Sequence, residues 1–205
     1  MPISDTLISS AIKGYMASVG FTGRDMAKIA DAVGRAVFIH VSVPNNTSAT
    51  IAGTVGPIGS VSSLAVAGVV STAMSSFMKA KGAQEGFTGR DMSKLADAIS
   101  NGVSQVLMTM VLTGSSVGLA IGAGTAKFVG LNANNLGGLI KAQLAGLGFT
   151  GRDMIKLADM VATGIVTHLQ TSATFSVLAT GAIAPVPPVG PLAIAGIPTI
   201  FSKIN

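Results

Sequence analysis

One pattern of charged side chains occurs three times in this chain and could bind an anion. The order is Arg-Asp-x-x-Lys-x-x-Asp, and it begins at Arg24, Arg90 and Arg152. Each copy follows the letters GFTG, and a helix that starts behind such glycines offers free backbone N–H groups to an anion. The aspartate beside each arginine would repel that anion, however, and the spacing is not that of a phosphate-binding loop. Anion binding is therefore the least favoured of the three functional interpretations of this sequence.

The two histidines are the other candidates for chemistry. His40 and His168 each lie twenty residues after the first glycine of their motif copy, but the equivalent residue of the second copy is Val106. A metal site needs three or four ligands, and no carboxylate lies near either histidine in the sequence. We therefore expect structural histidines at helix ends that contact backbone or a neighbouring group, and no metal ion.

No other arrangement of residues predicts catalysis. The chain has no cysteine, and it contains no nucleophile elbow, zinc-protease helix or dinucleotide-binding glycine pattern. Every aspartate except Asp5 belongs to a copy of the repeated motif, so paired acid–base carboxylates are not expected. We predict no enzymatic activity and no cofactor.

The repeated segment GFTGRDM-x-K-[I/L]-A-D is typical of a tight corner between two helices. Gly20 is placed to end the first helix as its C-terminal cap. Thr22 is a suitable N-cap for the second, and Asp25 three residues later would complete a capping box. Phe21 and Met26 are spaced to form a hydrophobic staple across the helix start. The predicted structural corner comprises Gly20, Phe21, Thr22, Arg24, Asp25 and Met26, then Gly86, Phe87, Thr88, Arg90, Asp91 and Met92, and then Gly148, Phe149, Thr150, Arg152, Asp153 and Met154.

Helices are predicted on both sides of each corner. Apolar residues recur at helical spacing over residues 5–19, and again after the corner. Lys28 lies three residues from both Asp25 and Asp31, so we expect ion pairs along one face of the second helix. A lysine also precedes each motif glycine by seven positions, which places the first helix within the repeat. These upstream lysines are Lys13, Lys79 and Lys141.

A long uncharged stretch follows the second helix of each unit. Residues 36–78, 98–126 and 160–202 contain no Asp, Glu, Lys or Arg. Parts of these stretches alternate bulky with small residues, for example from Val117 to Ile121, and a period of two favours extended strand. They are also longer than the roughly 18 residues of a membrane span.

We predict an α+β fold of three tandem repeats, each a helix–turn–helix followed by a glycine-rich extended or β segment. The units cover residues 1–64, 65–131 and 132–205, and the third ends in a proline-rich C-terminal arm. An all-α fold with membrane helices is the alternative.

The composition predicts that other molecules cover much of the surface. Of the 205 residues, 49% are hydrophobic and 10% are charged, whereas soluble proteins average about 25% charged residues. Neighbouring subunits or lipid must shield such a surface. The net charge of +5 is scattered along the chain, while nucleic-acid-binding proteins cluster their basic residues. We therefore expect protein partners, including copies of this chain, rather than nucleic acid, and membrane stays open as a partner.

The general character of the chain resembles that of tailed-phage virion structural proteins. It lacks cysteine and tryptophan, is rich in small residues and carries duplicated small units; no specific motif carries the resemblance. It implies a non-enzymatic structural subunit of a self-assembling particle in the tail, neck, baseplate or capsid decoration, whose uncharged segments make subunit contacts. Three near-copies suit a pseudo-threefold body or an adaptor between rings of different subunit number. A small membrane-inserted or pore-forming protein is the alternative.

Overall fold

Pairs of helices alternate with pairs of strands along the chain. The structure is a computed structural model that describes residues 4–42, 48–54, 59–67, 70–109, 111–117, 121–171, 175–180 and 193–201. The helices are α1 (Asp5–Ser18), α2 (Arg24–Ser42), α3 (Ser71–Gln84), α4 (Arg90–Thr109), α5 (Ala133–Gly146) and α6 (Arg152–Thr171). The strands are β1 (Ser48–Thr54), β2 (Gly59–Ala67), β3 (Val111–Val117), β4 (Ile121–Val129), β5 (Phe175–Thr180) and β6 (Ala193–Phe201). Each copy of the repeat contributes one helical hairpin.

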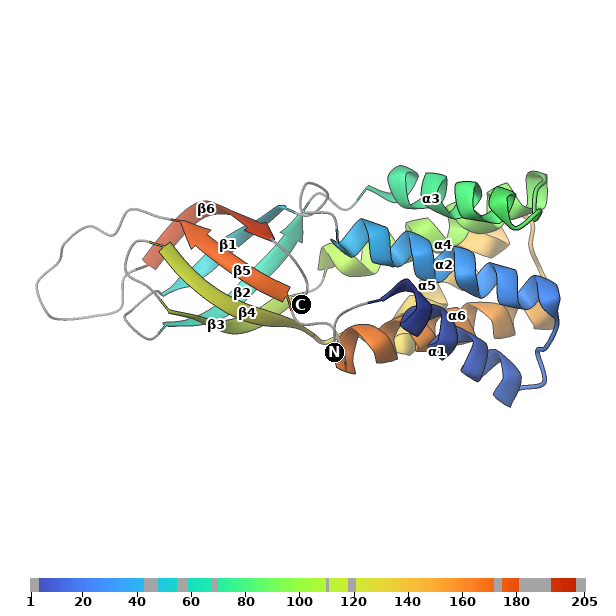
Figure 1. Cartoon of the computed structure of the whole chain (residues 1–205), viewed down its shortest axis with the longest axis horizontal. Helices are drawn as coiled ribbons and strands as arrows, with labels where there is room; N and C mark the ends of the chain where they lie inside the picture. Colours follow the sequence, from blue (N-terminus) through green and yellow to red (C-terminus); the bar gives the residue numbers. More distant parts are fainter. Residues whose placement is uncertain are drawn as a thin grey trace, which may run out of the picture.

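The six helices form a closed ring in which every helix packs against two others. Helices that follow one another in the chain are neighbours, and α1 also packs against α6, so the third hairpin closes onto the first (Figure 1). Because the three hairpins have related sequences and related contacts, the ring has pseudo-threefold symmetry.

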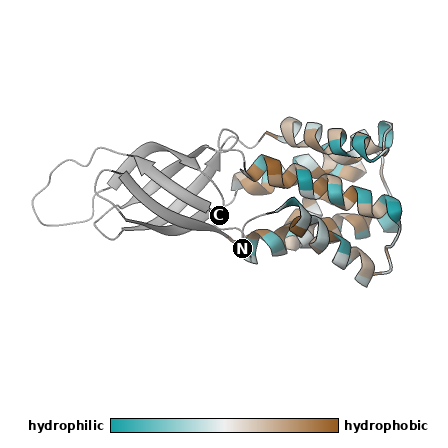
Figure 2. Ribbon diagram, viewed as in Figure 1, coloured by the Kyte–Doolittle hydropathy of each residue, from teal (hydrophilic) through white to brown (hydrophobic). Residues whose placement is uncertain are grey.

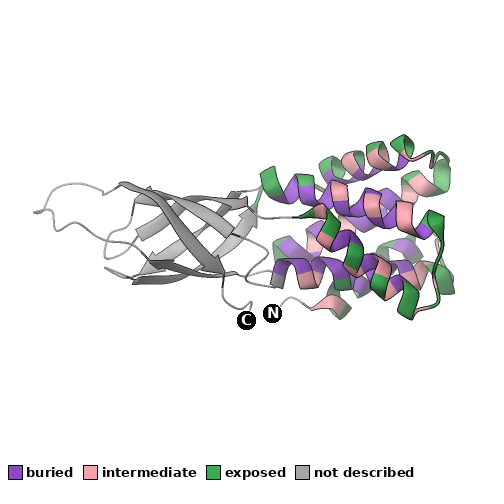
Figure 3. Ribbon diagram, turned by 90° about the horizontal axis from the view of Figure 1, so that it is seen from above, coloured by how far each residue is buried: buried purple, intermediate pink, exposed green. Residues whose placement is uncertain are grey.

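A single hydrophobic core fills this ring. Buried apolar side chains from all six helices belong to one cluster. Hydrophobic and hydrophilic positions alternate around each helix (Figure 2), and the buried positions face the interior of the bundle (Figure 3). The helices are therefore amphipathic elements that form because each apolar stripe can be buried against its neighbours.

Glycines bring neighbouring hairpins into close contact. A Cβ atom added at Gly164 in α6 would lie 2.5 Å from Ile12 Cγ1 and 2.9 Å from Ile12 Cα in α1. Gly102 in α4 receives Ile140 of α5 in the same way, with the added Cβ 2.8 Å from Ile140 Cγ1. Two seams between hairpins thus use the same device, in which a glycine of one long helix receives a buried isoleucine of the next short helix.

The strands pair with one another through their backbones. Neighbours in the order β1-β2-β3-β4-β5-β6 are antiparallel, and β1 also pairs with β6, which closes the sheet. Each helical hairpin leaves and returns to the side of the bundle at which strands are attached. The three GFTG corners consequently gather at the opposite end of the bundle (Figure 1).

The α+β class predicted from the sequence is wrong for the helical part of the chain, which is the part where side-chain burial is described. That part of the chain is 83% helical and consists of six helices without a sheet. The prediction counted a glycine-rich extended or β segment in each unit together with its helical hairpin. Instead, the apolar stripe of each helix is covered by two other helices, so the helical core is complete in itself.

The all-α alternative describes this body, apart from the membrane helices that it proposed. Among the described residues, no helix is both long and apolar enough to cross a membrane.

Candidate functional site

The three GFTG corners begin with the same glycine turn. Gly20, Gly86 and Gly148 have φ angles of +75°, +70° and +84°. Gly20 N–H donates to the Ala17 carbonyl at 3.0 Å, and Phe21 N–H donates to the Met16 carbonyl at 2.8 Å. The other two corners repeat both bonds. This pattern is a Schellman motif, which requires a left-handed residue after the helix end, and the predicted role of Gly20 as a C-terminal cap is confirmed.

We expect alanine at position 20 to lower the free energy of unfolding by about 1 kcal/mol, since a side chain disfavours the left-handed region by about that amount. The Gly14→Ala variant is a matched control, because Gly14 lies inside α1 with no atom within 4 Å of an added Cβ. That control should gain up to about 1 kcal/mol through helix propensity. Urea unfolding of both variants checks the difference, and equal stabilities would contradict it.

The second helix of each hairpin starts one residue later than predicted. The first helical bond of α2 runs from Ala27 N–H to the Gly23 carbonyl at 3.1 Å, so Gly23 is the N-cap. Gly89 and Gly151 have the same role. The Thr22 hydroxyl is exposed and makes no hydrogen bond to any described residue. The predicted threonine cap and capping box are therefore wrong, because Gly23 at φ +144° already turns the chain into the helix.

The last aspartate of the motif binds a lysine of the preceding helix. Lys28 Nζ lies 3.7 Å from Asp25 Oδ1, as predicted, but Asp31 pairs with Lys13 of α1 at 2.7 Å. Equivalent pairs follow in the other hairpins, with N–O distances of 2.7 Å for Lys79–Asp97 and 2.5 Å for Lys141–Asp159. The constant separation of 18 residues between these partners in all three copies is the sequence signal for this link.

Serine strengthens this link in two of the three hairpins. Ser9 donates a hydrogen bond to Asp31, and Ser75 donates one to Asp97. Burial opposes ionisation, yet the hydrogen bonds from Lys13 and Ser9 hold the pKa of Asp31 below its usual value. In the third hairpin Gly137 replaces the serine. The paired side chains are about one-third to one-half exposed, so each link contributes no more than about 1 kcal/mol.

Each corner therefore carries a net positive charge. Because the last aspartate is neutralised by the upstream lysine, the exposed end of the motif keeps two basic residues and one acidic residue. Arg24, Arg90 and Arg152 are exposed, and none of them forms an ion pair or hydrogen bond with another described residue. The repeat thus places three exposed guanidinium groups, unpaired within the described part of the chain, at one end of the bundle.

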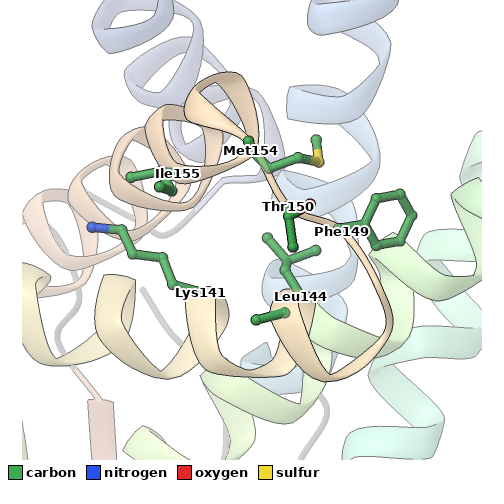
Figure 4. A pocket seen from close by; sticks show the side chains of 8 residues that line it. Lys141, Leu144, Phe149, Thr150, Met154 and Ile155 are labelled. Atoms are coloured by element: carbon green, nitrogen blue, oxygen red, sulfur yellow. The ribbon is translucent and has the colours of Figure 1, made fainter.

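A shallow apolar pocket lies beside two of the corners. The pocket of the third hairpin has a volume of about 260 Å³. It lies between Lys141 on one side and Phe149 on the other, with Leu144 and Met154 between them (Figure 4). The pocket of the first hairpin measures about 190 Å³, and all eight of its lining residues are equivalent to those of the third. Those residues are Lys13, Met16, Ala17, Phe21, Thr22, Gly23, Met26 and Ala27.

The second hairpin fills the corresponding space with its own methionine. Gly82 stands where the other copies have Met16 and Leu144. The side chain of Met92 occupies the room left by this glycine, since a Cβ added at Gly82 would lie 3.0 Å from Met92 Cε. Met92 is only 5% exposed, whereas Met26 is half-buried. The predicted staple methionine therefore has two roles, lining an open pocket in two copies and filling it in the other.

Corners of neighbouring hairpins also touch. Lys94 of α4 donates to the Leu147 carbonyl at 3.3 Å and lies 5.9 Å from the centre of the Phe149 ring. This contact couples the second corner to the third through a cation–π interaction and a charge-assisted hydrogen bond.

Both histidines lie in the last turn of a long helix, far along the chain from the corners. His40 has no exposed surface, and neither of its ring nitrogens has a hydrogen-bond partner among the described residues. His168 is 6% exposed, and its Nε2 is likewise without a partner there. Burial lowers the pKa of both groups. The contact to backbone or a neighbouring group predicted for His40 is thus not formed within this part of the chain.

The described residues contain no group of three or more His, Cys, Asp or Glu side chains that could hold a metal ion. Comparison with protein-family models, curated proteins and solved structures finds no match for this chain. The repeated corner with its free arginine and apolar pocket is therefore the candidate site, and its chemistry must be argued from its own residues.

Proposed function

We propose that this protein is a non-enzymatic structural subunit of a larger assembly. The observation that carries the proposal is the closed ring of three related hairpins, which gathers three near-equivalent corners at one end of the bundle. Such a hub presents three related corner surfaces, and this suits contacts with several surrounding subunits. The low charge content of the chain, 10%, also favours a surface that other proteins cover.

Sedimentation velocity of the purified chain from about 1 to 100 μM tests self-association, because assembly depends on concentration. We expect species several times heavier than the 20.4 kDa chain, and electron microscopy of those fractions should show discrete particles. A single 20.4 kDa species over the whole range, with no particles, would contradict a role in self-assembly.

The virion setting forms part of this proposal and is supported by the general character of the sequence. We expect quantitative mass spectrometry of density-purified virions from the source of the chain to find it at a fixed ratio to the other particle proteins. Removal of the chain by washing, or its absence from the particles, would contradict the proposal that it is a virion component. The proposed structural role would then still be tested by the sedimentation experiment.

A further inference from the structure

We propose that the two open corner pockets receive an acidic segment of a partner protein, which inserts an apolar side chain and places a carboxylate beside Arg24 or Arg152. This proposal rests on the proposed function and names the chemistry of the partner. The pocket of the first corner is lined by Phe21 and Met26, and that of the third by Phe149 and Met154.

The first argument is that the pocket recurs. Eight lining positions coincide between the first and third hairpins, although the lining residues themselves differ at two of them. Met16 and Ala27 of the first pocket are Leu144 and Ile155 in the third, so the apolar character is kept while the side chains change. The volumes of about 190 and 260 Å³ give each pocket room for one large apolar side chain.

Charge complementarity identifies the second feature of the occupant. Gly151 lines the pocket, and Arg152 directly follows it. The guanidinium of Arg152 is exposed and unpaired within the described residues. The pocket also lies at the start of α6, where the helix dipole adds partial positive charge. The neighbouring Asp153 opposes an anion, but Arg152 and Lys156 outweigh it by one positive charge. A carboxylate next to the inserted apolar side chain can therefore pair with Arg152, since arginine binds carboxylates with favourable geometry. The same reasoning holds for Arg24 at the start of α2.

The filled second corner sets the number of sites. Because Met92 occupies the space beside Gly82, the second hairpin lacks room for an apolar side chain although it has the same arginine. The chain should therefore bind two partner segments, not three. The second corner therefore serves as an internal negative control for binding at the first and third corners.

Methionine methyl NMR on the full chain tests the proposal directly. The chain has ten methionines, and the methyl signals of Met26, Met92 and Met154 can be assigned by single Met→Leu substitutions. The probe is a blocked tripeptide, Asp-Leu-Asp, added up to about 10 mM, a range that detects dissociation constants near 1 mM. We expect saturable shifts of Met26 and Met154 and no shift of Met92. The tripeptides Asn-Leu-Asn and Asp-Ala-Asp should each bind at least threefold more weakly.

Two substitutions separate the parts of the site. Arg152→Gln should weaken binding at Met154 at least threefold and leave Met26 unchanged, so the first corner serves as the internal control. Gly82→Leu gives the second corner the residue of the third and should displace the flexible Met92 side chain. The Met92 signal would then respond to the probe, and the number of sites would rise from two to three. Should this variant not fold, the pattern of the unsubstituted chain and Arg152→Gln still decide the matter.

Other occupants would produce other results. Shifts of Met26 and Met154 that appear on concentrating the chain alone would assign the pockets to a second copy. Shifts with phosphatidylglycerol vesicles but not with the peptide would assign them to lipid, and either result overturns the proposal. If no signal moves at about 10 mM probe while the chain still forms particles, the docking proposal falls and the structural role stands. If the signals shift while the chain stays a 20.4 kDa species, the self-assembly role fails instead.

Discussion

Replacing Gly164 by alanine should destabilise the protein by about 3 kcal/mol, at the upper end of the range for overpacked cores. The added Cβ would lie 2.5 Å from Ile12 Cγ1 and 2.9 Å from the Ile12 backbone nitrogen. A flexible side chain could move away from such a contact, but the backbone of α1 can do so only if the helix shifts. Since α1 and α6 close the ring, that shift would open the seam between the first and third hairpins.

Two controls isolate this effect. Gly138 in α5 has no atom within 4 Å of an added Cβ, so Gly138→Ala should be neutral or stabilising by up to about 1 kcal/mol. The second control combines Gly164→Ala with Ile12→Ala, which removes the clashing Cγ1 atom. This double variant should regain part of the unfolding free energy that Gly164→Ala alone loses, although the contact with the Ile12 backbone remains. Denaturant unfolding measures all of these variants, and a Gly164→Ala protein as stable as the Gly138→Ala protein would show that the seam is not tightly packed.

Acidification should destabilise the protein well before Asp31 and Asp97 protonate. Burial holds the pKa of His40 and His168 below the ordinary value of 6.5, so between pH 6.5 and their folded values the unfolded state binds more protons. Stability therefore falls as the pH falls through this window. Each histidine can contribute at most about 2 kcal/mol between about pH 7.5 and pH 5, since an unperturbed histidine titrates near 6.5.

The second hairpin supplies the matched variant, because Val106 stands at the equivalent position. The combined variant His40→Val and His168→Val should be close to neutral at about pH 7.5, since it removes buried nitrogens that lack partners within the described residues. The dependence of its unfolding free energy on pH should be much weaker between about pH 7.5 and pH 5. An undiminished slope would mean that other groups cause the acid sensitivity.

Asp31 and Asp97 lose their stabilising effect in a separate pH window. Hydrogen bonds from lysine and serine, opposed by burial, hold the pKa of Asp31 and Asp97 below 3.8. Their contribution to stability is therefore present above that value and is lost only as the pH falls further. The unfolding free energy of Asp31→Asn should consequently lie below that of the unsubstituted chain by a nearly constant amount, no more than about 1 kcal/mol, down to about pH 5, and this difference should shrink below about pH 4.

The corner could largely be predicted from the sequence because its signals are local. Gly20 and the residues around it fix a turn through backbone conformation alone, and the apolar stripe after Met26 fixes the buried face of α2. The N-cap was mispredicted because Thr22 and Gly23 are both suitable caps, and local preference does not decide between them. The ion pair of Asp31 was missed because it joins two helices, although its constant spacing in the three copies was visible.

The class of the fold depended on longer-range packing that the sequence did not reveal. Alternation of bulky and small residues indicated strands after each hairpin, but it could not show what the helices pack against. The decisive contacts, such as Ile12 in the notch at Gly164, join residues 152 positions apart. Likewise, the closed pocket of the second hairpin depends on Gly82, and the significance of this residue emerges only when Met92 is seen in the space beside it.

The closed ring also means that this single chain does what a trimer of separate hairpins would do, with the three hairpins joined covalently. Three separate hairpins would have to meet in solution, and their complex would dissociate on dilution. Here the linking segments hold the second and third hairpins at a high effective concentration. In a true homotrimer any substitution would appear three times at once, whereas here each hairpin can change alone. The linkage therefore lets one copy carry Gly82 or Val106 while its sister copies keep an open pocket or a buried histidine.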